Sequence, residues 1–378
     1  MQFALKPTSP AAVNKLLGLE VLRFLTAFAI LIYHYQHFSF VADKPVDLVQ
    51  EHLPLHGLLH VFYRFGASGV WIFWGISGFI FFWKYRDAIA DQSVGGWKFF
   101  VLRFSRLYPL HLVTLLLVAM LQPVYFGLNG YFFVYQENDL RHFLLQLLMI
   151  LQRGNSFNAP IWSILVEVLV YFLFFLMLRA TKSWLLNLVI VVVCAQLDGE
   201  IAACFAFFYI GGLAAIVRQA VASVPSRFAV ETGAWLAAVL LPPIAWIFAR
   251  DQLDPLKFQL MLTYTPILLF CLSRDITVPA SIQKAVEAAG NMTYSSYLLH
   301  FPIQLVIVLG FAILRSPIPL YDVKFFGVYI ATTLLASYFT YRYFEAPAQN
   351  LIRQNLIRDV LLRPGVTAVR PTALSITK

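Results

Sequence analysis

The amino-acid sequence predicts an all-α polytopic membrane protein with about ten transmembrane helices plus one short re-entrant or interfacial helix. Hydrophobic residues make up 60% of the chain and charged residues only 12%, whereas soluble domains carry about 25% charged residues. Long apolar runs also recur along the sequence. We therefore expect membrane lipid around the protein. The net charge of +9 does not indicate a nucleic-acid partner.

The apolar runs define ten candidate spans. The first is a retained span, because the residues before it lack the charged, apolar and small-residue order of a cleavable signal peptide. One further apolar segment, 141–152, is about twelve residues long, which favours a re-entrant or interfacial helix. The ten predicted spans are 16–36, 65–83, 107–126, 161–179, 184–198, 200–217, 231–249, 258–273, 294–314 and 324–344.

Lysine and arginine positions predict the orientation of these spans. With the N-terminus in the cytoplasm, 19 of the 28 Lys and Arg residues lie on the inner side, 8 lie outside, and Arg23 lies within the first span. If residues 141–152 crossed the membrane, this excess of Lys and Arg on the inner side would be lost. We therefore expect both termini in the cytoplasm, a membrane domain over 1–347 and a basic cytoplasmic tail over 348–378.

The first span carries two ionisable groups at membrane depth, where each is costly. Arg23 and His34 are eleven residues apart, so they share one helix face about 16 Å apart along the axis. Glu20 lies three residues before Arg23 and can pair with it. Arg23 alone could snorkel inward and His34 alone could be interfacial. Their shared face favours a functional pair.

Two further stretches carry polar groups near span ends. Arg103 and Arg106 are three residues apart at an inner end and can grip a phosphate in bidentate fashion, although arginines also mark inner ends simply by topology. In "WSILVE", Trp162 suits the outer interface and flanks Ser163. Glu167 lies deeper, where it is either functional or bonded to another helix.

The second predicted span contains several glycines, which have no side chain and so leave the helix narrow. These glycines permit close approach of another helix or of a slender ligand; they are Gly66, Gly69, Gly75 and Gly78. The ninth span carries three polar side chains along one helix face near its inner end, which are Tyr294, Tyr297 and His300. At the inner end of the last span, we expect Glu345 to pair with an arginine.

Metal binding has weak support in the sequence. Three histidines at i, i+4 and i+8, His52, His56 and His60, could share a helix face and hold zinc. No cysteine and no HExxH arrangement accompanies them, so we expect no metal site. The three cysteines lie singly within apolar runs, which indicates core packing.

Taken together and in this order, these stretches resemble the acyltransferase 3 family of membrane acyltransferases. The resemblance covers about 16–347. The matching residues are Arg23 and His34 in an Arg-x10-His pattern, "SGF" at 77–79, the Arg-x2-Arg pair Arg103 and Arg106, "WSILVE" at 162–167, "YLLH" at 297–300 and "FEAP" at 344–347. The family often has Asp where Glu20 stands, and a second Glu where this chain has Val168, which makes the outer polar network less certain.

The resemblance implies a ten-helix fold in a bacterial cytoplasmic membrane and transfer of an acyl group, expected to be acetyl, from cytoplasmic acyl-CoA to an extracytoplasmic or exported carbohydrate or glycolipid. Acyl-CoA is then a co-substrate, and no bound cofactor is expected. Expected catalytic residues are His34 and Glu167. The remaining expected site residues are the donor-binding Arg23, Arg103, Arg106, Ser77, Gly78, Tyr297 and His300, and the supporting Glu20, Trp162, Ser163 and Glu345.

The residues alone favour the same chemistry. Two arginines at an inner mouth suit a polyanionic nucleotide, a glycine-lined path suits a pantetheine arm, and His34 near the far side suits a general base. A transporter of an anionic metabolite is the alternative, but transporters often show paired halves and broken helices, and the sequence shows no convincing pair. A structural or sensory protein is a third interpretation.

The predicted orientation has a direct test. A reporter fused after Lys378 should report the cytoplasm, and a reporter inserted within 40–55 should report the outside, because the Lys and Arg bias places those segments there. Activity of paired cytoplasmic and extracytoplasmic reporters in intact cells measures this. A C-terminal reporter active only outside would contradict the ten-span topology.

Overall fold

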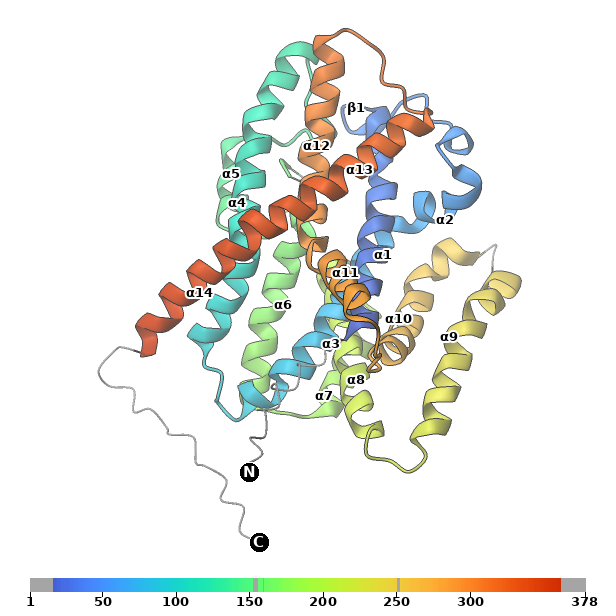
Figure 1. Cartoon of the computed structure of the whole chain (residues 1–378), viewed down its shortest axis with the longest axis vertical. Helices are drawn as coiled ribbons and strands as arrows, with labels where there is room; N and C mark the ends of the chain where they lie inside the picture. The colour runs from blue at the N-terminus through green and yellow to red at the C-terminus, as the bar shows by residue number, and fades with distance from the viewer. Residues whose placement is uncertain (1–15, 152–155, 159, 250–251, 362–378) are drawn as a thin grey trace, which may run out of the picture.

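The computed structural model describes residues 16–151, 156–158, 160–249 and 252–361, and is built almost entirely of helices (Figure 1). Nine helices in these ranges are long and apolar enough to cross a membrane, which confirms the polytopic all-α class. The helices are α1 (Leu17–His34), α2 (His56–Phe65), α3 (Gly69–Ala90), α4 (Gly96–Asn129), α5 (Leu140–Leu147), α6 (Ile161–Ala180), α7 (Trp184–Cys194), α8 (Glu200–Val221), α9 (Arg227–Ala249), α10 (Leu253–Leu272), α11 (Ala280–Asn291), α12 (Thr293–Ile313), α13 (Val323–Thr340) and α14 (Ala346–Leu361).

Short elements connect these helices. The loop after α1 contains a small hairpin of β1 (Phe40–Val41) and β2 (Lys44–Pro45). A π-helical turn, Tyr341–Glu345, joins α13 to α14, and Figure 1 shows the two as one long tilted element across the bundle. The predicted tail 348–378 begins within α14, and its residues 362–378, like residues 1–15, lie outside the described residues.

Two apolar segments form short helices. Residues 141–152, predicted as re-entrant or interfacial, contribute the eight-residue α5, capped by the Asp139 side chain. The predicted span 184–198 contributes only the eleven-residue α7. At 1.5 Å per residue α7 is about 16 Å long, roughly half of a hydrocarbon core.

Although α7 is short, it still returns the chain through the bundle. Helices α3 and α6 run in the same direction, because Trp74 packs on Trp162 and, further along both chains, Asp87 pairs with Lys182. Helix α8 runs in the same direction as α10, with Phe207 on Phe258 and, later, the Arg218 guanidinium over the Phe270 ring. Helix α3 is parallel to α8 as well, because Trp71 packs on Phe207 and, further along both helices, the Phe82 ring lies against Gly212. Helix α7 must therefore reverse the path between α6 and α8.

The glycines of α3 pack against other helices. A Cβ added to Gly78 would overlap the Phe208 carbonyl of α8, and one added to Gly211 would overlap the carbonyl of Gly75. Just before α3, Gly66 meets the Ala29 carbonyl of α1 in the same way. The predicted glycine-lined ligand path is therefore wrong: these positions are filled by neighbouring backbone, as close helix packing in a membrane requires.

Replacement of Gly78 by alanine should destabilise the protein. The new methyl group meets fixed backbone of α8, and overpacking of this kind costs about 1–3 kcal/mol of unfolding free energy. Thermal unfolding in detergent measures the change. Gly310→Ala, in α12 with open space around its Cα, is the matched control and should not lower the unfolding temperature; an equal effect of both variants would contradict the packing role.

Candidate functional site

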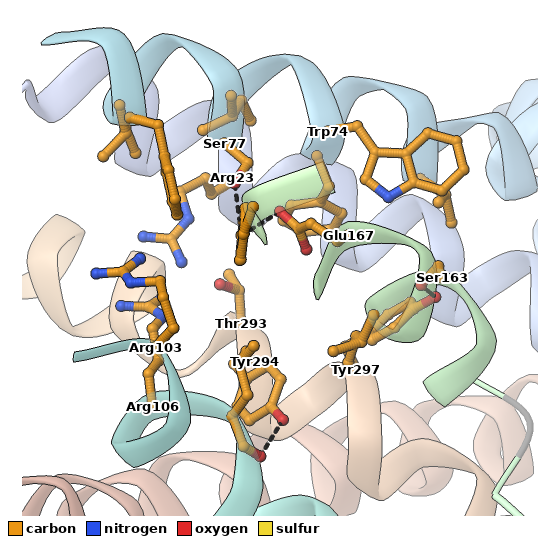
Figure 2. A pocket seen from close by; sticks show the side chains of 18 of the residues that line it. Arg23, Trp74, Ser77, Arg103, Arg106, Ser163, Glu167, Thr293, Tyr294 and Tyr297 are labelled. Atoms are coloured by element: carbon orange, nitrogen blue, oxygen red, sulfur yellow. Dashed lines mark hydrogen bonds between the residues drawn. The ribbon is translucent and has the colours of Figure 1, made fainter. Parts of the chain in front are cut away.

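A cavity of about 300 Å³ lies among α1, α3, α4, α6, α11 and α12 (Figure 2). We call it the cationic pocket, because four cationic side chains line it and two carboxylates accompany them. Its charged lining residues are Arg23, Lys84, Arg103, Arg106, Glu20 and Glu167. The sequence-predicted arginines thus come together in one cavity, with an excess of positive charge.

The four cations differ in how strongly the protein already engages them. Arg23 forms the predicted ion pair with Glu20, at 3.1 Å between Nη1 and Oε2. The Arg103 guanidinium lies over the Phe81 ring at 4.7 Å and donates to the Tyr85 hydroxyl at 3.0 Å.

The remaining two cations are freer. Within the described residues, neither Arg106 nor Lys84 has a side-chain hydrogen bond or ion pair. These two cations are therefore the most available to an anionic ligand.

Glu167 belongs to the cationic pocket. Its carboxylate accepts a short hydrogen bond from the Tyr171 hydroxyl, one turn along α6, and Tyr171 bonds Ser77 at 2.7 Å. Glu167 and His34, both predicted as catalytic residues, do not contact each other: His34 packs against Tyr33, His37 and His300. Glu167 thus contributes charge and hydroxyl contacts on the side of the arginines.

Tyr297 forms the far wall of the cationic pocket. Its hydroxyl is bonded to Ser163 at 2.7 Å, as Figure 2 shows. On its other side, the Tyr297 ring lies 6.1 Å from the His300 ring between centroids. Tyr297 and Ser163 therefore stand between the cationic pocket and the histidines.

Trp162, predicted at the outer interface, is half-buried against Trp74.

Three imidazoles gather beyond Tyr297, and we call them the histidine cluster. The ring centroids of His37 and His300 each lie 4.8 Å from that of His34. His300 and His37 are buried. His300 was expected with the donor-binding residues, but the structure places it beside His34, and neither it nor Gly78 lines the cationic pocket.

Hydrogen bonds fix the ring orientations. His34 Nδ1 lies 2.9 Å from the Ile30 carbonyl oxygen and His300 Nδ1 lies 3.3 Å from that of Ser296. A carbonyl can only accept, so both rings carry a proton on Nδ1 and a lone pair on Nε2. Gln304 donates to the His34 carbonyl at 2.7 Å, which leaves its own oxygen to accept from His37 Nδ1 at 3.3 Å.

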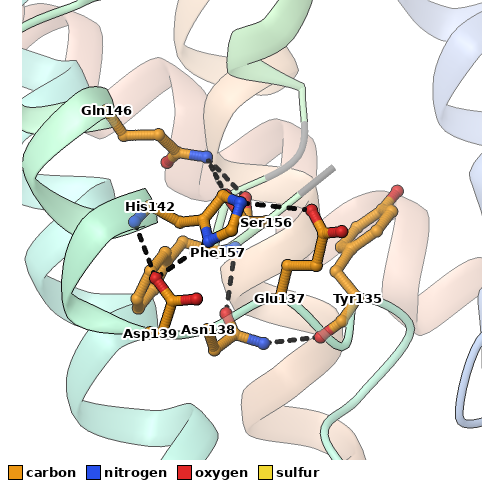
Figure 3. Close-up of polar contacts among 8 residues, drawn as sticks. All are labelled: Tyr135, Glu137, Asn138, Asp139, His142, Gln146, Ser156 and Phe157. Carbon is orange, nitrogen blue, oxygen red and sulfur yellow. Dashed lines mark hydrogen bonds and ion pairs between the residues drawn. The ribbon is translucent and has the colours of Figure 1, made fainter. Parts of the chain in front are cut away.

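A loop held by the polar contacts in Figure 3 approaches the histidine cluster through Tyr135. The Tyr135 ring lies 6.0 Å from His37. Asn138 holds this loop by donating to the Tyr135 carbonyl at 2.5 Å and accepting from the Phe157 amide at 2.9 Å. The pKa of Asp139 is lowered by hydrogen bonds from the backbone and ring of His142. The loop thus packs one aromatic ring against His37 of the cluster.

Glu345 is buried but does not have the expected arginine partner. Its carboxylate accepts from Ser295 at 2.6 Å and from Gln349 at 3.0 Å. Ser295 on α12 is within direct reach, so two neutral donors replace the ion pair.

No group of three His, Cys, Asp or Glu side chains arranged for a metal ion occurs in the part of the chain that the structure describes.

The sequence interpretation missed several lining residues. Lys84 follows Ser77 by seven residues and Tyr171 follows Glu167 by four, so helical periodicity places each pair on one face. His37 and Gln304 have weaker signals. His37 lies in a 3-10 turn after α1, and Gln304 lies four residues after His300, one turn further along α12.

Comparison with known proteins identifies relatives. A family model described as an acyltransferase domain matches residues 16–342. Acyltransferase MdmB of Streptomyces mycarofaciens is 29% identical over 179 residues, which are 46% of this chain and 42% of that protein. The chain thus matches less than half the length of this relative. No solved structure matches the chain.

Proposed function

Because the chain belongs to the acyltransferase 3 family, whose model matches residues 16–342, we propose that it is a membrane acyltransferase. In this proposal it moves an acyl group from cytoplasmic acyl-CoA to a hydroxyl of an extracytoplasmic or exported carbohydrate or glycolipid. The observation that carries the proposal is the arrangement of two chemically different sites, the cationic pocket and the histidine cluster, on either side of Tyr297.

The cationic pocket is the proposed donor site. Coenzyme A carries phosphates, and arginine and lysine side chains bind phosphate through charge-assisted hydrogen bonds. Arg106 and Lys84 supply the freest charges, and Arg103 can bind while its guanidinium stays stacked on Phe81. The Lys and Arg bias of the sequence supports a cytoplasmic position for this end of the bundle, and the membrane in this proposal is a bacterial inner membrane.

The donor's pantetheine arm then follows the apolar wall of the pocket. Phe73, Ile76 and Ile80 of α3 line this wall, and Phe73 reaches the Tyr297 ring at 6.3 Å between centroids. For the thioester to meet His34, the Tyr297 side chain must turn away from Ser163. This path replaces the glycine-lined path expected from the sequence.

His34 is the proposed general base. Its Nδ1–H bond to the Ile30 carbonyl leaves the Nε2 lone pair to take the proton of an acceptor hydroxyl. The hydroxyl oxygen forms a bond to the thioester carbon, the carbon–sulfur bond breaks, and the proton finally joins the coenzyme thiolate. The enclosed histidine cluster favours a short acyl group such as acetyl. This chemistry uses no bound cofactor.

Replacing Arg106 should weaken donor binding. Arg106→Gln removes a charge that has no hydrogen bond or ion pair within the described protein, so affinity for acetyl-CoA should fall about 10- to 100-fold. Lys84→Gln should also lower the affinity for acetyl-CoA. Calorimetric titration of purified protein with acetyl-CoA measures both. Arg315→Gln, a surface arginine after α12, is the control, and affinities equal to the control's would contradict the donor site.

Replacing His34 should stop transfer. His34→Ala removes the base, which costs about 10²–10⁴ in rate, and should leave acetyl-CoA binding nearly intact, since His34 does not line the cationic pocket. Transfer of radiolabelled acetyl groups to a glycan acceptor in vesicles measures the rate. His60→Ala, on the exposed surface of α2, is the matched histidine control. A His34→Ala rate within a few-fold of the parent would refute the assignment, and uptake of an unacylated solute would favour a transporter.

A further inference from the structure

His300 has a buried nitrogen with no partner. Its side chain is only 1% exposed, and Nε2 makes no hydrogen bond within the described protein. Its Nδ1–H faces the Ser296 carbonyl, so Nε2 is a lone-pair acceptor. Leaving such an atom unpaired is costly, which points to a hydrogen-bond donor that is present only during function.

The donor that reaches this nitrogen can be identified from the neighbouring rings. His34 Nδ1–H is already used by the Ile30 carbonyl. When His34 takes a proton on Nε2, it gains a second N–H that needs an acceptor. The His300 ring lies 4.8 Å away between centroids, tilted by 41°, and its Nε2 is the unpartnered acceptor next to His34.

We infer that His300 is a positioning residue of acyl transfer, whose Nε2 accepts a hydrogen bond from the protonated His34 ring. The inference rests on the proposed function, and assigns to His300 a role other than donor binding. The proton leaves the acceptor hydroxyl, resides on His34 Nε2 while the carbon–oxygen bond forms and the carbon–sulfur bond breaks, and then passes to the coenzyme thiolate. His300 itself stays neutral and stabilises the transient imidazolium.

His37 is a poorer candidate for this role. It lies equally close to His34, but its Nδ1 is bonded to Gln304, and the structure leaves no enclosed orphan nitrogen on it. It also packs toward Phe40 and Tyr135, away from Tyr297. His300 is the ring next to Tyr297, the side from which the thioester arrives.

Two amide substitutions distinguish the roles of the two ring nitrogens of His300. The amide nitrogen of His300→Asn can replace Nδ1–H toward Ser296, but nothing stands at the Nε2 position. His300→Gln puts an amide oxygen near the Nε2 position, where it can accept from His34. We expect the transfer rate constant kcat to fall about 10- to 100-fold in the Asn variant, as for loss of a hydrogen bond to a charged group, and to recover to within about tenfold of the parent in the Gln variant.

The remaining outcomes decide against the inference. Near-parental kcat in the Asn variant, or better rescue by Asn than by Gln, would show that only the bond to Ser296 matters. An unchanged kcat with a raised KM for acetyl-CoA would assign His300 to donor binding. If the Asn variant fails to insert, His300→Met, which has the length of Gln without its amide, replaces it; equal kcat of Met and Gln variants would overturn the role. A parent protein without acyl transfer would overturn the proposed function itself.

Discussion

The low polarity of the membrane makes a charged side chain within the bundle costly unless it has a partner. Arg23 pairs with Glu20 on its own helix, and Glu167 takes its hydroxyl contact from Tyr171. Glu345, by contrast, reaches to α12 for Ser295. Only the last of these contacts joins two elements, so it holds α12 beside the π-helical turn that precedes α14.

Close packing on one face of α3 frees its other face for polar residues. Gly75 and Gly78 bring the α8 backbone into contact, while Ser77, between them in sequence, points to the opposite side and bonds Tyr171. Seven residues further along α3, Lys84 lines the same pocket. These glycines of α3 therefore pack against α8, and its polar residues line the cationic pocket. The motif "SGF" contains one residue of each kind, Gly78 and Ser77.

The sequence predicted the helical class, most span boundaries and the gathering of Arg23, Arg103 and Arg106, because hydropathy and helical spacing determine these features locally. It did not predict that Glu167 would lie apart from His34, since the relative depth of residues on different helices depends on tertiary packing. The same limit explains His300: spacing along α12 placed it on one face with Tyr297, but not on the histidine side of that tyrosine. The length of α7 was overestimated because apolar composition continues past its last helical residue.

Tyr297 lies between the cationic pocket and the histidine cluster. Its hydroxyl is held by Ser163 within the cationic pocket, and its ring faces His300. In the proposed reaction, this bond would keep a donor in the cationic pocket apart from the histidine cluster, so that His34 would not activate water against the thioester. In the proposed reaction, displacement of Tyr297 by the arriving acyl arm would expose the thioester to His34 at the moment when the acceptor is present. The separation of the two proposed sites would then also limit hydrolysis of the donor.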